Sequence, residues 1–165
     1  LLVMPVTPTQ IMLSKVWSMA LIVLVAAFLS LNLMVRGALG VPIDGSLALF
    51  FTGAALSLFA TTSMGIFLAT LARNMPQFGM LLMLAIIPLQ MLSGGTTPRE
   101  SMPEIVQNIM LIAPTTHFVE LGQAILYRGA GLEVVWQQFL ALALIGTVLF
   151  FLSLARFRKT IGQMA

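Results

Sequence analysis

Four long uncharged segments dominate the chain. Residues 16–35, 46–72, 74–98 and 134–155 carry no Asp, Glu, Lys or Arg. A helix needs about 20 mostly apolar residues to cross the hydrocarbon core of a bilayer. The segments are continuously apolar rather than alternating, so they are typical of helices and not of barrel strands. We therefore predict four transmembrane helices, at about 16–35, 47–71, 77–93 and 134–155.

The composition of the whole chain agrees with this pattern. Of its 165 residues, 59% are hydrophobic and 8% are charged, against roughly 25% charged in soluble domains. The fold class is therefore an all-α integral membrane protein. Its net charge of +3 comes from few, scattered basic residues, so no nucleic-acid partner is expected. The chain begins Leu1-Leu2 without an initiator Met, and we interpret it as a fragment of a longer protein.

The distribution of charge between the predicted loops indicates an orientation. With both ends in the cytoplasm, the inner side holds five basic and no acidic residues, namely Lys15, Arg73, Arg156, Arg158 and Lys159. The outer side then holds three basic and five acidic residues, namely Arg36, Arg99, Arg128, Asp44, Glu100, Glu104, Glu120 and Glu133. Positive residues favour the cytoplasmic side, so we predict that both ends of the chain are cytoplasmic.

A sharp helix start precedes the first span. Thr7 and Gln10 have the spacing of a capping box, and Pro8 stands at the first helical position, where its missing N–H costs nothing. Residues 1–5 before them are too apolar for an ordinary solvated loop. This segment lies in the membrane interface or fits a groove on another protein, and the sequence alone leaves both readings open.

The second span carries a small residue at every fourth position. These residues are Gly53, Ser57, Thr61, Gly65 and Ala69. Such a face lets another helix approach closely. It serves static packing within the bundle, or else a sliding or dimerising contact.

The outer segment 101–129 predicts two short amphipathic helices. Ser101 and Glu104 have the spacing of a second capping box, and Thr115 or Thr116 is expected to cap the next helix after Pro114. That helix should stop near Gly129 or Gly131. Two such helices before a span suggest a re-entrant hairpin that dips into the outer leaflet.

The second of these helices carries a polar stripe of four residues, His117, Glu120, Gln123 and Tyr127. A carboxylate in the outer leaflet is costly unless it is paired or hydrated. Glu120 therefore faces a polar vestibule or a partner side chain, or it is simply solvated near the helix N-terminus, where the dipole favours negative charge.

Motifs for enzyme chemistry are missing. The chain has no phosphate-binding GxxxxGK[ST] loop and no HExxH, and it contains one His and no Cys. A hydrolytic pair of His117 with Ser93 or Ser101 has no support from the spacing. We expect no cofactor, no metal, no catalytic residues and no enzyme activity in this chain.

The order of several motifs resembles the C-terminal part of a bacterial type-2 ATP-binding-cassette exporter permease. The matching segments are LVMPVTP at 2–8, Lys15, SG at 93–94, Pro98, SMP at 101–103, PTTHFVE at 114–120 and RFRK at 156–159. They cover nearly the whole chain in order. The resemblance implies a half-transporter of six spans in the bacterial inner membrane, which pairs with a second copy and is driven by a separate cytoplasmic ATPase through alternating access.

The resemblance also implies roles for particular segments. The family's cytoplasmic coupling helix matches residues 1–15, with Pro5, Thr7, Pro8, Gln10, Ile11 and Lys15 as candidate contacts to the ATPase. Residues 16–165 form the transmembrane domain. The outer re-entrant helices match 101–128, with His117, Phe118, Glu120 and Tyr127 as candidates for the outer gate and exit path. The main alternative is a membrane-anchoring or assembly subunit without a transport path, and a weaker one is a membrane enzyme.

Overall fold

The computed structural model describes residues 7–40, 43 and 45–162, and within them all regular structure is helical. The helices are α1 (Pro8–Leu29), α2 (Leu47–Leu71), α3 (Met75–Leu92), α4 (Glu104–Met110), α5 (Pro114–Arg128) and α6 (Leu132–Gly162). A π-helical segment, η1 (Ser30–Ala38), continues α1, and a short 3-10 helix, η2 (Arg99–Ser101), precedes α4.

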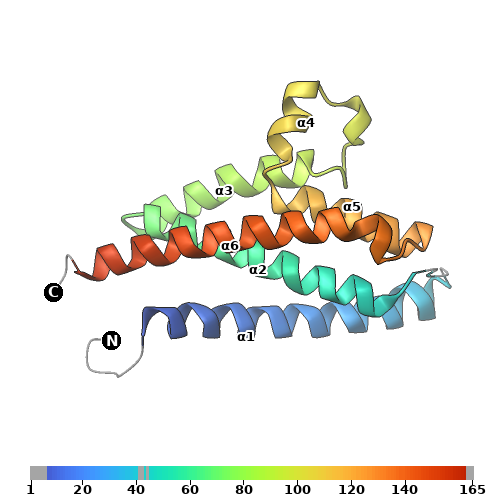
Figure 1. The fold of residues 1–165 in the computed structure, drawn as a ribbon, viewed down its shortest axis with the longest axis horizontal. Coiled ribbons are helices and arrows are strands. Elements are labelled where there is room, and N and C mark those ends of the chain that lie inside the picture. Colours follow the sequence, from blue (N-terminus) through green and yellow to red (C-terminus); the bar gives the residue numbers. More distant parts are fainter. Residues whose placement is uncertain (1–6, 41–42, 44, 163–165) are drawn as a thin grey trace.

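Four helices are long and apolar enough to cross a membrane, at Thr9–Ala38, Leu47–Leu71, Met75–Leu92 and Leu132–Phe157. The predicted all-α class with four spans is confirmed. The described chain ends and the short connection between α2 and α3 lie at one end of the bundle (Figure 1). The outer segments lie at the opposite end, with α4 projecting away from the bundle. We call the first the terminal end and the second the loop end.

The helix that begins at Pro8 does not stop before the first span. Residues 8–15, expected as a coupling helix, and the span that follows form one continuous helix, α1. This continuity follows from the local sequence, because Pro8–Leu29 contains neither Gly nor a second Pro to interrupt the backbone hydrogen bonds. Residues 8–15 are thus a rigid extension of the first span.

The two short outer helices form a bent pair, since α4 and α5 meet at 93° across the break at residues 111–113. The predicted capping box of Ser101 and Glu104 and the predicted cap at Thr115 or Thr116 are wrong. Ser101 Oγ donates to Pro98 O at 2.7 Å and thereby closes η2, so α4 begins at Glu104 without a side-chain cap. Helix α5 begins at Pro114 itself. A proline is tolerated at the first helical position because its missing N–H would have no partner in the helix there. The end of α5 is as predicted, with Gly129 in the left-handed conformation at φ 62°.

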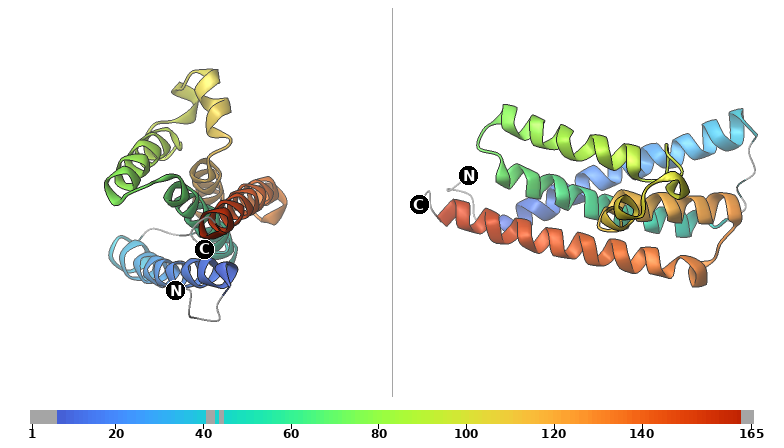
Figure 2. Two further views of the ribbon diagram at one scale, coloured as in Figure 1. Left: turned by 90° about the vertical axis from the view of Figure 1, so that its left-hand side faces the viewer. Right: turned by 90° about the horizontal axis from the view of Figure 1, so that it is seen from above.

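Helix α2 is the centre of the bundle. It contacts α1, α3, α5 and α6, most extensively α6, and Figure 2 shows it between its neighbours in both views. The core beside it consists of Phe50, Leu121, Ile125, Val135 and Leu142 at the loop end. A second cluster of Met12, Phe150 and Leu154 lies toward the terminal end.

The contact between α2 and α6 depends on small residues. A Cβ at Gly146 would lie 2.7 Å from Phe59 Cδ1 and 3.2 Å from Ala60 Cα. Nearer the terminal end, the buried Ser153 hydroxyl lies 3.1 Å from the carbonyl oxygen of Ser63 in α2 and 2.7 Å from that of Leu149 in its own helix, and its single hydrogen is shared between the two. Close approach and a hydrogen bond between helices are the usual substitutes for hydrophobic association in a bilayer.

Helices α1 and α3 are exposed along their apolar length. The most hydrophobic window of each has no buried residue, whereas α2 and α6 have 22% and 28% of theirs buried. A large apolar surface of this kind is covered in a membrane protein by lipid or by other transmembrane helices.

Candidate functional site

The start of α1 is fixed by its own side chains. The Thr7 amide donates to Gln10 Oε1 at 2.9 Å, and the Gln10 amide donates to Thr7 Oγ1 at 3.4 Å. This confirms the predicted capping box. Two orphan amides at the first turn are satisfied locally, so the helix end is ordered without help from another element.

The first two turns of α1 have an inward and an outward face. Met12 and Val16 are buried, and Met12 joins Phe150 and Leu154 in the core. On the other side Gln10, Leu13 and Ser14 are exposed, and Leu13 is 45% exposed. An exposed leucine between polar residues at a helix end is available for contact with another protein.

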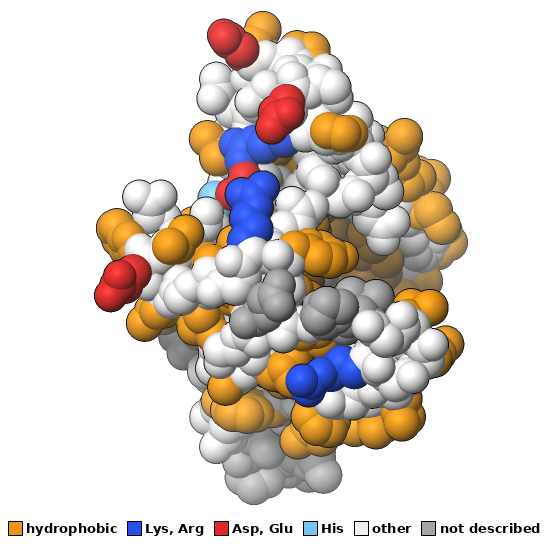
Figure 3. Space-filling model, turned by 90° about the vertical axis from the view of Figure 1, so that its right-hand side faces the viewer, with side chains coloured by type: hydrophobic (Ala, Val, Ile, Leu, Met, Phe, Trp, Pro, Cys, Tyr) orange, Lys and Arg blue, Asp and Glu red, His pale blue; other side chains and the backbone are white. Residues whose placement is uncertain are grey.

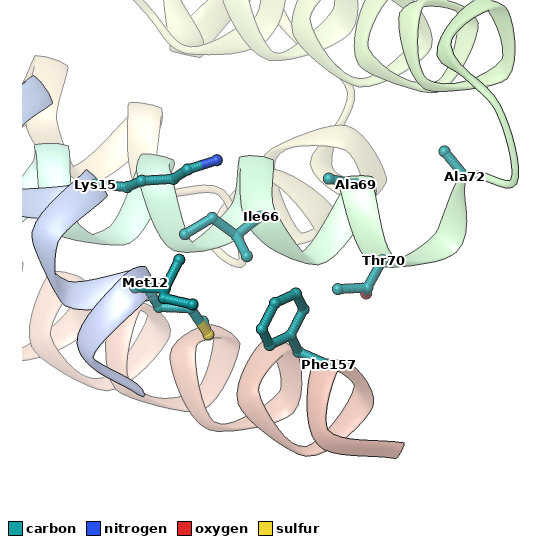
Figure 4. A pocket seen from close by; sticks show the side chains of 8 residues that line it. Met12, Lys15, Ile66, Ala69, Thr70, Ala72 and Phe157 are labelled. Atoms are coloured by element: carbon teal, nitrogen blue, oxygen red, sulfur yellow. The ribbon is translucent and has the colours of Figure 1, made fainter. Parts of the chain in front are cut away.

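Ile11 and Lys15 border a pocket of about 280 Å³ at the terminal end. Met12 from α1, Ile66 from α2 and Phe157 from α6 converge in it, and Lys15 lies on its rim (Figure 4). Ile11 is thus half-buried against the bundle rather than directed outward. Among the candidate coupling residues, Pro5 lies outside the described residues, and only the backbone placement of Pro8 is described.

At the loop end a polar pocket of about 640 Å³ lies where α3, α5 and α6 meet. Within it the Arg99 guanidinium forms an ion pair with the Glu120 carboxylate, and the two side chains are 30% and 31% exposed. The predicted need of Glu120 for a partner is therefore met by Arg99. Figure 3 shows this end of the molecule, where basic and acidic side chains gather.

The four candidate outer residues do not form one surface. His117 Nε2 lies 2.8 Å from Leu111 O and so ties α5 to the end of α4. Phe118 packs against Phe50 of α2, with ring centroids 5.9 Å apart. Tyr127 is 71% exposed, and Glu120 alone of the four lines the polar pocket.

The small-residue face of α2 is also divided between two environments. Gly53 and Ser57 are buried, and a Cβ at Gly53 would lie 2.7 Å from Leu121 Cδ2 of α5. Thr61 donates to Ser57 O of its own helix at 2.9 Å. Around a Cβ at Gly65 there is open space, and both Gly65 and Ala69 line pockets at the terminal end. The loop-end half of this face packs within the bundle and the other half does not.

Three features of these sites have no local signal in the sequence. Arg99 pairs with a residue 21 positions away. Gln138 of α6 lines the same pocket, and its Oε1 is buried without a hydrogen-bond partner among the described residues. Gly146 forms the close contact with α2. Pairings between distant segments depend on the tertiary fold, so no spacing rule finds them.

This architecture, with four candidate spans, a capped helix start at one end and a bent helix pair at the other, is that of a multi-span helical membrane domain. The chain belongs to the ABC-2 type transporter family, whose profile matches residues 1–127. It is 67% identical over all its 165 residues to the inner membrane transport permease YhhJ of Escherichia coli K12. It is 31% identical over 163 residues to the probable multidrug ABC transporter permease YbhR of the same strain.

Comparison of lengths shows that these relatives are longer proteins. The chain covers 44% of YhhJ and 44% of YbhR. It covers 33% of a third relative, the probable multidrug ABC transporter permease YbhS, with 32% identity over 127 residues. No solved structure is significantly similar to the chain. These relatives are named transport permeases, and the chain corresponds to less than half of the length of each.

Proposed function

We propose that this chain is the C-terminal part of an export permease of the bacterial inner membrane, driven by a separate cytoplasmic ATPase. The observation that carries this proposal is the start of α1. It is capped, rigidly continuous with a span, and presents Gln10, Leu13 and Ser14 outward. A force applied there by a partner protein is transmitted to the membrane helix without an intervening hinge.

The names of the relatives support export across the inner membrane, because YhhJ is an inner membrane transport permease and YbhR a probable multidrug ABC transporter permease. Transport would proceed by alternating access, with the ATPase bound at the terminal end. The exposed apolar lengths of α1 and α3 offer surface for the other helices of the permease, for lipid, and for a second copy in a homo- or heterodimer.

The orientation with both ends cytoplasmic is tested by cysteine labelling, since the chain contains no Cys. Cysteines are introduced singly at Glu133, which is exposed in the first turn of α6, and at Ser14, which is exposed in α1. An impermeant thiol reagent should label the cysteine at Glu133 in intact cells and the one at Ser14 only after permeabilisation. The reverse pattern would overturn the orientation and with it the assignment of α1 to the ATPase.

At the loop end the Arg99–Glu120 pair would hold the outer gate. It joins the segment after α3 to α5, so separation of these elements must break a charge-assisted hydrogen bond. The pocket around it also contains Gln123 and Gln138, which gives a polar route between otherwise apolar helices.

Glu120→Gln tests this role because it keeps the shape of the side chain and removes the charge. We expect a large fall in export at unchanged protein level, and a similar fall for Arg99→Gln. The charge-swapped pair Arg99→Glu with Glu120→Arg should recover much of the activity. Export near the wild-type level from Glu120→Gln would show that the carboxylate is only a surface charge.

A further inference from the structure

A second pocket at the terminal end lies between three helices and adjoins the one at Ile11, with which it shares Lys15, Ile66, Ala69 and Ala72. Its volume is about 670 Å³. Helix α1 contributes Lys15 and Met19, and helix α2 contributes Thr62, Gly65, Ile66, Ala69 and the adjoining Ala72. The remaining wall consists of Arg73, Asn74, Met75 and Phe78. We call it the α1–α3 pocket.

The α1–α3 pocket is basic at its rim. Lys15 and Arg73 line it, and none of its lining residues is acidic. No carboxylate among the described residues forms a salt bridge with either cation, because the described acidic residues, Glu100, Glu104, Glu120 and Glu133, all lie in the segments of the loop end. Two cations without a counter-charge in the described part of the chain attract an anion into the space between them.

Below this rim the pocket is apolar. Met19 follows Lys15 by one helical turn, and Phe78 follows Asn74 by one turn. On α2, Ile66 lines the same two pockets as Lys15, and Thr62 lies one helical turn deeper. The polar end of the pocket is therefore at the membrane edge, where α2 ends and α3 begins, and its apolar end points into the hydrocarbon region. This is the polarity of a membrane lipid.

We propose that the α1–α3 pocket binds an anionic phospholipid, with the phosphate between Lys15 and Arg73 and an acyl chain along Met19 and Phe78. Basic pockets between transmembrane helices are suited to phosphate headgroups. The lipid enters from the leaflet at the terminal end. This inference needs only that the chain is embedded in a membrane, and it is independent of the proposed coupling to an ATPase.

The proposal can be tested by placing a larger side chain at Gly65, where it would fill the α1–α3 pocket. A Cβ at Gly65 would have no heavy atom within 4 Å, so the side chain of Gly65→Leu starts in open space at a residue that lines the pocket. Gly79 of α3 offers a matched control, because a Cβ there also meets nothing within 4 Å and Gly79 does not line the pocket. Arg73→Gln removes rim charge, with Arg128→Gln at the loop end as its control.

The experiment uses the full-length permease in phosphatidylcholine bilayers with spin-labelled phosphatidylglycerol as the probe. Electron paramagnetic resonance measures the fraction of labelled lipid that the protein immobilises, compared with spin-labelled phosphatidylcholine. We expect the wild-type protein, Gly79→Leu and Arg128→Gln to prefer phosphatidylglycerol. Arg73→Gln should weaken this preference about fivefold, since one cation near the surface contributes on the order of 1 kcal/mol, and Gly65→Leu should abolish it.

Three results would overturn the proposal. Equal retention of both lipids by the wild-type protein would show that the pocket has no preference for anionic lipid. An undiminished preference for phosphatidylglycerol in both Gly65→Leu and Arg73→Gln would show that the lipid binds elsewhere. This is the result expected if another segment of the longer protein fills the pocket. Complete displacement of the probe by inorganic phosphate at constant ionic strength would identify a site for the free ion instead.

Discussion

Replacement of Leu13 by Asp is expected to abolish the stimulation of ATP hydrolysis by the permease and to release the ATPase from the complex. Leu13 is 45% exposed on the outward face of α1, so the substitution leaves the core of this chain intact. In a docked interface the new carboxylate would be buried without a partner, at a cost of several kcal/mol. Binding should weaken by about a hundredfold or more. The measurement is co-purification of the ATPase together with its hydrolysis rate.

Ile105→Asp is the control for this variant. It places the same charge on an isoleucine that is 73% exposed in α4, at the opposite end of the molecule. The ATPase should stay bound to it. Ile11→Asp should also reduce coupling, but its half-buried side chain lines the pocket that contains Phe157, so part of its effect would be on stability. A complex that survives Leu13→Asp would remove the outward face of α1 from the coupling interface.

Gly146→Val should prevent the correct packing of α6 on α2. Its Cβ would lie 2.7 Å from the Phe59 ring and 3.2 Å from the backbone of Ala60, and the backbone of a helix cannot move away as a side chain can. Overpacking of a close helix contact costs about 1–3 kcal/mol or more. We expect a clear drop in melting temperature and in the yield of monodisperse protein, measured on the full-length permease in detergent.

Gly79→Val is the matched control, because it makes the same chemical change within a span. A Cβ at Gly79 meets no heavy atom within 4 Å, so any effect of helix propensity is shared and only the packing differs. The two variants should differ in melting temperature by several degrees. Equal melting temperatures would mean that α2 and α6 are not in close contact at Gly146.

The spans could be predicted from the sequence because the bilayer itself imposes their signal. A run of about 20 apolar residues is required at each crossing, whatever the helix packs against. The capping box of Thr7 and Gln10 can also be predicted from the sequence, because its two hydrogen bonds lie within four residues. The helix end at Gly129 depends on one left-handed residue. Features of this kind are encoded locally.

The outer caps show the limit of local signals. Ser101 has the spacing of a capping residue, but its hydroxyl donates to Pro98 O instead. Thr115 and Thr116 follow Pro114 in the sequence, and Pro114 already begins the helix. Where two local structures compete for one hydroxyl, the spacing alone does not decide which one forms.

Features that join distant segments were not predictable from spacing. The hydrogen bond from Ser153 to Ser63 joins residues 90 positions apart, and the Arg99–Glu120 pair joins the segment after α3 to α5. The small-residue stripe from Gly53 to Ala69 is visible in the sequence as a spacing of four. Its division into a packed half and an open half depends on where α5 lies across α2, which no pattern within α2 encodes.

Cross-linking from the start of α1 tests whether this end of the permease receives the ATPase. A single cysteine replaces Gln10 in the full-length protein, with any cysteine elsewhere removed, and membranes containing the co-expressed ATPase are treated with a short bifunctional thiol–amine reagent. We expect a permease–ATPase adduct that is lost with Leu13→Asp, and no adduct from a cysteine at Tyr127. An ATPase adduct from Tyr127, or none from Gln10 in an active complex, would contradict this expectation.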